Sequence, residues 1–424
     1  MRFASSISAA RTAEQAVQEL LDSIDRAITA GMVDLGVLFS TAHFEDELGD
    51  VVERIGETFP GAVLLGCTTE ATIGVGREIE RAPSMSLLVG SMPGVEIRPF
   101  HLRQQQLAAA NTPFDWEHLV GVSPENHPFF LALGDPFRID IQDFVEKTNR
   151  FCPKARLAGG VASAGHAPRQ NRLILNGEIS REGIVGVSLT GAFEVDTVVS
   201  QGCRPIGKSF VITRGDRNVI YELGGKPVLE QLHQVLINLP DEDEKLARES
   251  LFVGRVIDEH LRRFGRGDFL VQNIVGVDRR SGAVGVQGYV RTGTTVQFHV
   301  RDAASADEDL RNLLGAIADR HYRGALIFGC NGRGTNMWPY PNHDARALTE
   351  EVGDVPVAGA FCGGEFGPVG GKNFVHGFTA SIALFRNPDD APDEVESAGT
   401  APAEERSPDT ALDGDEPNGN AAPS

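Results

Sequence analysis

A repeated order of elements constrains this fold more than any other feature of the sequence. Three segments each contain an apolar strand, a helical pattern, a proline and a second strand that ends in small residues. The first strands lie at residues 34–41, 128–136 and 324–334, the helices at 44–58, 139–151 and 343–352, and the second strands at 62–70, 155–163 and 357–365. Each unit closes on another strand, at 84–91, 183–191 and 376–385.

Glycines keep the same register in the three units. They form the pairs Gly36 and Gly66, Gly134 and Gly159, and Gly329 and Gly359, which are 30, 25 and 30 residues apart. A strand, one crossover helix and a second strand fit these separations, and such crossovers favour parallel neighbours. The strands that follow have the pattern of hairpins. We therefore expect an α/β (α+β) protein in which repeated strand-helix-strand-hairpin units form mixed sheets covered by helices, in two related domains.

Residues 198–320 do not follow the repeated order of elements. Pro205 and Gly207 mark a turn near the start, a helix is expected at 227–237, and a highly charged helical stretch follows at 241–263. Apolar residues then alternate through 268–302, with breaks at 280–282 and 291–293, which predicts a meander of three strands. A helix at 306–321 leads into the third unit.

Length and charge divide the chain further. Its 424 residues predict two or three domains, and half of the formal net charge of −20 lies in residues 387–424. This segment has 11 acidic residues, one basic residue and six prolines, so we expect a disordered tail.

Composition also excludes several classes of protein. Six lysines and no basic run argue against nucleic-acid binding, and no apolar stretch approaches the ~20 residues that cross a bilayer. Five cysteines without CxxC pairs fit reduced thiols in the cytoplasm better than disulfides or zinc. The sequence has no P-loop, G-x-G-x-x-G or H-x-x-x-H motif, so we expect no metal and no cofactor.

Several motifs together resemble the FIST family, whose N-terminal and C-terminal domains occur in bacterial signalling proteins and in an animal F-box protein. The resemblance covers about residues 31–385. It rests on GCRPIG at 202–207, CNGRG at 330–334, VAGAFCGGEFGPV at 357–369 with HGF at 376–378, and GCTTEA at 66–71. In GCTTEA, Thr69 and Glu70 stand where the family usually has Gly-Glu, and GGVASAG at 159–165 departs further.

The resemblance implies a FIST N-terminal domain at 1–197 with two units, a FIST C-terminal domain at 198–386, and the tail at 387–424. It also implies a sensory module of intracellular signal transduction that binds a small molecule, for which amino acids have been proposed. No attached output segment is visible, so we expect a stand-alone sensor that signals to a separate partner protein.

The turn CNGRG offers the clearest chemistry for such a ligand. Gly332 and Gly334 let a ligand approach the main chain, and the Arg333 guanidinium can hold a carboxylate or phosphate. Glu365, at the end of the matching second strand, could then meet the ammonium group of a zwitterion. Alternatively, Arg333 makes an internal ion pair, with Glu365 or elsewhere, and binds nothing.

Residues near these two turns, and their equivalents in the first unit, complete the candidate ligand site. The candidates are Cys330, Asn331, Gly332, Arg333, Gly334, Cys362, Gly364, Glu365, Cys67 and Glu70. Cys67 and Glu70 could line a second pocket or merely pack. Trp338 could act as a lid over the site or anchor its loop in the core.

Two other functions stay open. A Cys-dependent hydrolase or transferase would use Cys330 or Cys362 as nucleophile with His376 as base, whereas a buried cysteine is more often a small apolar filler. A structural adaptor would recruit proteins through the acidic tail and edge strands.

Overall fold

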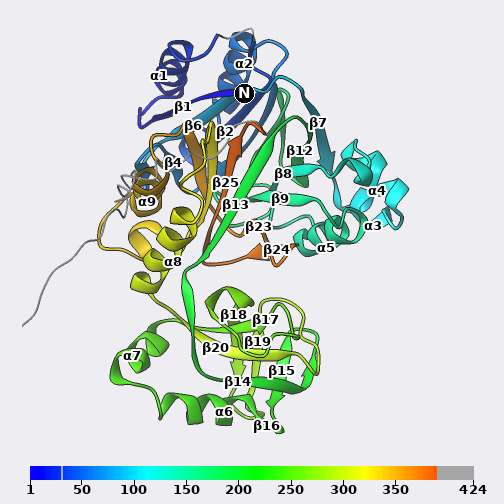
Figure 1. Ribbon diagram of the computed structural model, residues 1–424, viewed down its shortest axis with the longest axis vertical. Coiled ribbons are helices and arrows are strands. Elements are labelled where there is room, and N and C mark those ends of the chain that lie inside the picture. Colours follow the sequence, from blue (N-terminus) through cyan, green and yellow to red (C-terminus); the bar gives the residue numbers. More distant parts are fainter. Residues whose placement is uncertain (30–31, 389–424) are drawn as a thin grey trace, which may run out of the picture.

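The computed structural model of the chain describes residues 1–29 and 32–388. Two parts are visible in Figure 1, an upper one that contains the three repeat units and a lower one drawn mainly in green. We call the lower part, from β14 to β20, the barrel, and the remainder the body. The chain enters the barrel after β13 (Glu194–Gln201) and leaves it before α8 (Ala303–Gly315).

Each repeat unit contributes four strands to one sheet of the body. The orders are β1 (Arg2–Ser8), β6 (Met85–Ser91), β2 (Leu35–Thr41), β3 (Val63–Thr69); β7 (Val95–Leu102), β12 (Ile184–Gly191), β8 (Phe129–Gly134), β9 (Arg156–Val161); and β13, β25 (Thr379–Arg386), β21 (Gly324–Cys330), β22 (Val357–Cys362). In every unit the third and fourth strands are parallel and the others antiparallel. The predicted parallel pairs are thus confirmed.

The hairpin that follows each second strand leaves its own unit. β4 (Thr72–Gly74) and β5 (Arg77–Ile79) extend the third sheet, β10 (Leu173–Leu175) and β11 (Glu178–Ser180) extend the first, and β23 (Glu365–Val369) and β24 (Lys372–His376) extend the second. Every unit therefore donates one hairpin and receives one, so the three sheets are linked in a closed cycle.

One position in each parallel pair requires glycine for the same physical reason. A Cβ atom would lie 2.4 Å from the Leu38 carbonyl oxygen at Gly66, 1.9 Å from that of Ala132 at Gly159, and 2.2 Å from that of Ile327 at Gly359. Real Cβ atoms do not approach a carbonyl so closely, so only glycine fits where the second strand passes the first. The repeat seen in the sequence marks these three crossings.

Helices cover the outer face of each sheet. They are α1 (Ala13–Asp25) and α2 (Leu48–Thr58) on the first, α3 (Gln104–Ala109), α4 (Pro113–Val120) and α5 (Ile141–Phe151) on the second, and α8 and α9 (His343–Val352) on the third. The inner faces meet in one central core that includes Phe39, Leu131 and Phe328. The rings of Phe39 and Phe328 are 5.9 Å apart, so the first and third sheets contact each other directly.

The barrel is a closed antiparallel sheet. Its order is β14 (Cys203–Asp216), β20 (Thr295–Arg301), β17 (Leu251–Val256), β18 (Phe269–Asp278), β19 (Ala283–Val286) and β15 (Val219–Leu223), and β15 pairs back with β14. β16 (Lys226–Pro227), α6 (Val228–Leu236) and α7 (Asp241–Glu249) complete it. Phe210, Val253 and Phe298 belong to its own core.

Two predictions for the barrel were wrong. The charged stretch 241–263 is not a continuous helix, because α7 ends at Glu249 and the apolar residues that follow form β17. Strand β17 then pairs with both β18 and β20, so β20 does not follow β19 in a meander. The β18–β19 hairpin itself is present.

The α+β class with mixed sheets and covering helices is confirmed. The expected domain boundary between residues 197 and 198 falls inside β13, and the central core receives side chains from both sides of it. The acidic segment from residue 389 onward lies outside the described residues. Short 3-10 helices lie at η2 (Ala42–Phe44), η3 (Pro124–Asn126), η4 (Arg266–Asp268) and η5 (Gly334–Asn336).

Candidate ligand site

The two turns singled out in the third unit lie side by side. Cys330 at the end of β21 is in register with Cys362 at the end of β22, and the Asn331 amide donates to the Cys362 carbonyl at 3.0 Å. This follows from the parallel pairing, which brings the carboxyl ends of both strands to one edge of the sheet. CNGRG and CGGE therefore share that edge, as the repeat predicts.

Arg333 is fully engaged on one side of its guanidinium. Its Nε and Nη2 donate to Asp344 Oδ2 and Oδ1 at 2.6 and 2.8 Å, and its charge lies 5.0 Å from the Trp338 ring centroid. Both partners of this ion pair are almost completely buried. Arg333 thus pairs with Asp344 rather than with Glu365, while its Nη1 has no hydrogen-bond partner among the described residues.

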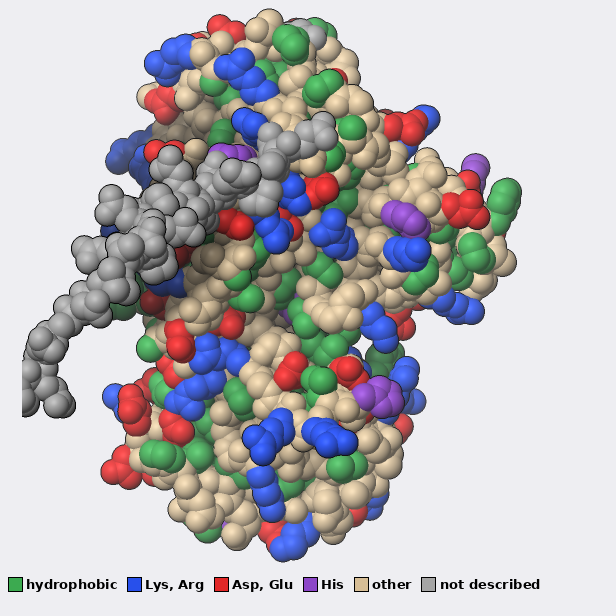
Figure 2. Space-filling view, in the orientation of Figure 1, with side chains coloured by type: hydrophobic (Ala, Val, Ile, Leu, Met, Phe, Trp, Pro, Cys, Tyr) green, Lys and Arg blue, Asp and Glu red, His purple; other side chains and the backbone are tan. Residues whose placement is uncertain are grey.

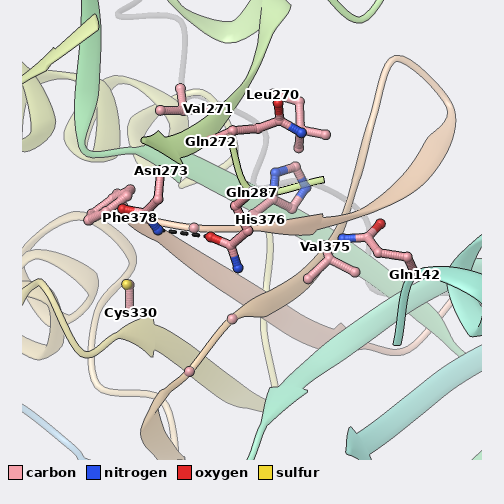
Figure 3. Close-up of a pocket in the computed structure, with 13 residues that line it drawn as sticks. Gln142, Leu270, Val271, Gln272, Asn273, Gln287, Cys330, Val375, His376 and Phe378 are labelled. Carbon is pink, nitrogen blue, oxygen red and sulfur yellow. Dashed lines mark hydrogen bonds between the residues drawn. The ribbon is translucent and has the colours of Figure 1, made fainter. Parts of the chain in front are cut away.

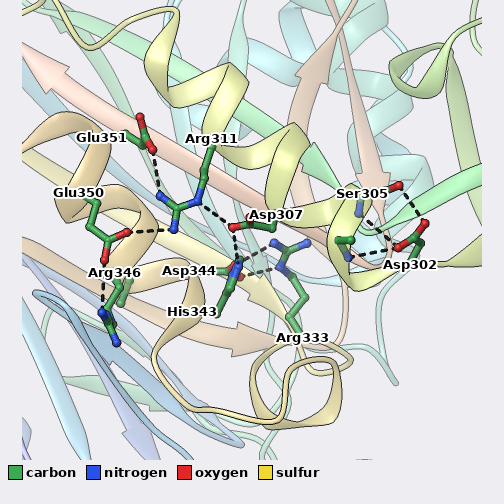
Figure 4. A network of polar contacts seen from close by, with 12 residues as sticks. Asp302, Ser305, Asp307, Arg311, Arg333, His343, Asp344, Arg346, Glu350 and Glu351 are labelled. Atoms are coloured by element: carbon green, nitrogen blue, oxygen red, sulfur yellow. Dashed lines mark hydrogen bonds and ion pairs between the residues drawn. The ribbon is translucent and has the colours of Figure 1, made fainter.

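The pair belongs to a longer chain of polar contacts (Figure 4). His343 contacts Asp344 through Nδ1 and Asp307 through Nε2, both at 2.9 Å, and its ring stacks on Trp338 with 3.5 Å between centroids. Burial alone would raise the pKa of Asp344, but Arg333 and His343 hold it well below its usual range. Trp338 therefore anchors its loop on this network.

A hairpin from the first unit supports the same turn. Glu78 on β5 accepts hydrogen bonds from the amides of Asp344 and Ala345 at 2.9 and 3.0 Å, and so caps the start of α9. Glu80 accepts a hydrogen bond from the Thr335 amide at 3.0 Å. The exchange of hairpins thus holds the Arg333 turn, and sequence reasoning missed Glu78 because its partner lies more than 260 residues away.

Glu365 lies in a buried environment of its own. Its Oε2 accepts a hydrogen bond from the Thr379 hydroxyl at 2.7 Å, and its Oε1 has no partner among the residues described. Burial raises the pKa of Glu365 to about 8. The carboxyl group therefore holds its proton through most of the neutral range and does not offer a full negative charge to an ammonium group.

A cavity of about 120 Å³ opens at the seam between body and barrel (Figure 3). Residues from β18, the position that follows β19, the two turns, α5 and the end of β24 surround it. They are Leu270, Val271, Gln272, Asn273 and Gln287 from the barrel, and Gln142, Cys330, Gly363, Gly364, Val375, His376, Gly377 and Phe378 from the body. Its size is comparable with the ~150 Å³ cavity that takes up benzene in a protein core.

Phe378 fixes the cavity wall to both parts of the molecule. Its backbone has φ = 62°, which is unusual for a bulky residue, and its carbonyl accepts a hydrogen bond from the Gly202 amide at 2.7 Å. Its ring lies 4.3 Å from that of Phe252 in β17 and 5.3 Å from the Arg301 guanidinium in β20. The backbone strain is thus held at the junction between body and barrel.

The structure separates the residues proposed from sequence into several places. Cys330 and Gly364 line the seam cavity, whereas Arg333 and Gly334 belong to the buried network around Asp344. Asn331 and Glu70 line a second cavity of about 20 Å³, close to the size of one water molecule. Cys67 and Cys362 pack in the central core, Glu365 is buried in β23 and does not line the cavity, and the Gly332 carbonyl accepts a hydrogen bond from Arg301 at 3.3 Å.

The cysteines at and near the cavity are thiols rather than thiolates. Burial raises the pKa of Cys330 to about 12, and it also raises the pKa of Cys362 well above the usual value. His376 donates from Nε2 to the Gly367 carbonyl at 3.0 Å, and burial lowers its pKa to about 4. Within the described part of the chain no hydrogen bond joins Cys330 to His376. A thiolate activated by a base is therefore not assembled here.

The described residues contain no group of three or more His, Cys, Asp or Glu side chains arranged to hold a metal ion. They also contain no helix that combines the length and apolar character needed to cross a membrane.

Comparisons with known proteins agree with one another. The FIST N domain matches residues 34–226 and the FIST C domain matches residues 229–368. An uncharacterised protein of Mycobacterium tuberculosis is 35% identical over 388 residues, which cover 91% of this chain and 100% of the relative. One of Mycobacterium bovis is 34% identical and covers 91% of this chain and 99% of its own length.

Among solved structures, cyanuric acid hydrolase from A. caulinodans aligns with a TM-score of 0.37 and 8% identity, over 91% of this chain and 99% of the hydrolase. The matches to the two domain descriptions, which together span most of the chain, show that it belongs to the FIST family, whose domains are associated with sensory signal transduction.

Proposed function

We propose that this protein is a sensor that takes up one small metabolite in the cavity at the seam between body and barrel. The observation that carries the proposal is the cavity itself, because residues from both parts line it. Ligand sites commonly lie between domains, where a few polar groups are set among apolar ones. A ligand held there would contact both parts and stabilise their relative position.

The site suits a sensor because a residue in its wall, Phe378, also contacts the barrel. Phe378 joins the cavity to Gly202, Phe252 and Arg301 through contacts described above. A ligand that binds more tightly when the barrel is in one of two positions relative to the body would increase the population of that position. We propose that a separate signalling protein reads this position, and that the sensor acts in the cytoplasm, where its five free cysteines remain reduced.

An amino acid or a similar anionic or zwitterionic metabolite is the ligand class that the sequence predicts. Such a ligand would need the charges of Arg333 and Glu365. Asp344 already occupies two nitrogens of Arg333, and neither Arg333 nor Glu365 lines the seam cavity. Amino acids therefore belong in the test panel as one class among several.

A cavity-filling variant provides the test. A Cβ at Gly377 meets no atom within 4 Å, so Gly377→Leu should fill the cavity without displacing the backbone. Gly56 on α2 is equally unobstructed and far from the cavity, so Gly56→Leu is the matched control. Thermal shift should be measured for both variants and the unmodified protein with amino acids, carboxylic acids and neutral amides.

We expect at least one compound to raise the Tm of the unmodified protein and of Gly56→Leu by on the order of 5 °C at 100 times its Kd. Gly377→Leu should show no such rise. A panel without any stabilising compound, or an equal rise in Gly377→Leu, would refute the cavity as the sensory site.

A further inference from the structure

The seam cavity has an uncharged polar lining. Four carboxamides, from Gln142, Gln272, Asn273 and Gln287, are its main polar side chains, and none of its lining residues is Asp, Glu, Lys or Arg. His376 adds an imidazole whose Nε2 is occupied by the Gly367 carbonyl. A ligand bound here meets amide groups, a thiol and apolar surface rather than a fixed charge.

Two of these amides orient each other. Asn273 Nδ2 donates to Gln287 Oε1 at 2.8 Å, as the dashed line in Figure 3 shows. Among the described residues no other hydrogen bond engages the Asn273 Oδ1 acceptor or the Gln287 Nε2 donor, and the pair is accessible to solvent, so both atoms can meet a third group. An acceptor next to a donor complements a molecule that carries an N–H beside a C=O.

Charged side chains near the cavity do not line it. Arg333 is paired with Asp344, and Arg301 donates to the Gly332 carbonyl and lies 5.3 Å from the Phe378 ring centroid, although Nε of Arg255 and Arg301 and Nη1 of Arg333 have no hydrogen-bond partner among the described residues. Glu365 accepts from Thr379. A ligand carboxylate in the cavity would therefore lose water without gaining an ion pair, which is unfavourable.

We propose that the ligand is a small uncharged amide, of about benzene size, recognised by the Asn273–Gln287 pair. This inference rests on the proposed function, because it specifies the ligand class of the same cavity. Phe378, Val271 and Val375 supply an apolar wall for a flat ring of the ligand, and the carboxamides form hydrogen bonds with the amide group of the ligand. The site thus selects amides against the corresponding acids.

Isosteric pairs of probes test this selectivity. Binding of benzamide and benzoate, and of nicotinamide and nicotinate, should be measured by calorimetry at neutral pH. The variants are Asn273→Ala, Gln287→Ala, the cavity-filling Gly377→Leu, and Gln234→Ala, an exposed glutamine on α6 outside this cavity, as the matched control. The unfolding curve of each variant checks that it is folded.

We expect each amide to bind at least ~10-fold more tightly than its acid, since leaving the carboxylate unpaired removes at least this much affinity. Asn273→Ala and Gln287→Ala should each weaken amide binding by ~5- to 10-fold, and Gln234→Ala should leave it unchanged.

Two outcomes separate the failure of this inference from that of the proposed function. If the acids bind as tightly as the amides and Gly377→Leu abolishes their binding, the cavity is a ligand site but the amide class is wrong, and Arg333 Nη1, which has no partner among the described residues, becomes the candidate anchor. If no probe binds, the amide class is wrong, and the broader thermal-shift panel decides separately whether the cavity is a ligand site. If the probes bind and Gly377→Leu leaves their binding unchanged, both proposals fail.

Discussion

The body and the barrel achieve closure in opposite ways. In the barrel, the strands that pair lie within about 100 residues of one another, and the closed sheet has its own core. In the body, closure depends on hairpins exchanged among three units that are distant in sequence, and one central core is shared by all. The comparison indicates a body that unfolds as one cooperative unit and a barrel that can open or move separately.

Replacing one buried phenylalanine in each part should give the largest effect. Phe328 lies in the central core and Phe298 in the barrel core, and both are at most 1% exposed. Truncation to alanine removes about 3–5 kcal/mol in either place. Both tryptophans, Trp116 and Trp338, lie in the body, so tryptophan fluorescence during urea unfolding reports on that part alone.

Phe328→Ala should therefore lower the unfolding midpoint seen by fluorescence, whereas Phe298→Ala should mainly lower protection of barrel amides from hydrogen exchange. If either variant destabilised both parts equally, body and barrel would form a single cooperative unit and the comparison would be wrong.

The buried ion pair of the body should give the next largest effect. Asp344→Asn keeps the volume of the side chain but removes the charge that balances Arg333, which should lower the free energy of unfolding by about 2–3 kcal/mol. Glu350→Gln, in an exposed ion pair with Arg311, should change it much less, because solvent screens this pair. Urea unfolding followed by fluorescence measures both, and equal effects would show that the network does not stabilise the body.

The pH dependence should differ between the two parts and give the smallest effect. Burial raises the pKa of Glu78 and Glu365 in the body to about 8, above the ~4.3 of an unfolded chain. The folded body then holds protons that the unfolded chain releases, so its stability falls as pH rises through the window that ends near 8. In the barrel, burial lowers the pKa of His299 to about 4, so stability is lost there only as pH falls below ~6.5.

Between pH 6.5 and 8 the body should thus lose roughly 1.5 kcal/mol per group. Glu365→Gln should about halve this slope, because Glu78 still contributes, while Glu350→Gln retains it. A slope that persists unchanged in Glu365→Gln would exclude this carboxyl group as its source. Urea midpoints from fluorescence at a series of pH values provide the measurement.

Local patterns in the sequence predicted much of the body. Helix α9 begins and ends where its pattern predicts, and the glycines at 66, 159 and 359 marked the parallel crossings. The sequence could not predict which sheet each hairpin joins, because a two-stranded hairpin has the same local pattern whichever strand it pairs with. β17 was missed for a related reason, since this short strand contains Arg255 and lies between charged neighbours.

The candidate site shows the same limit. Sequence placed the two turns together through the repeat, but the partner of Arg333 depended on where α9 and the hairpin carrying Glu78 came to lie. The cavity depended on the barrel, which supplies five of its lining residues, four from β18 and one from the position after β19. Nothing in the order of residues indicates that Gln287 faces the end of the third unit across a domain seam.

The exchange of hairpins also has a consequence for synthesis on the ribosome. β4 is made early, yet its partner β22 emerges only after almost the whole chain has been translated. At roughly 5–20 residues per second, the edge of β4 waits about 15–60 s for its strand. A nascent chain of this kind exposes open sheet edges for that time, so premature release or a stalled ribosome would leave β4 without β22 and β9 without β23.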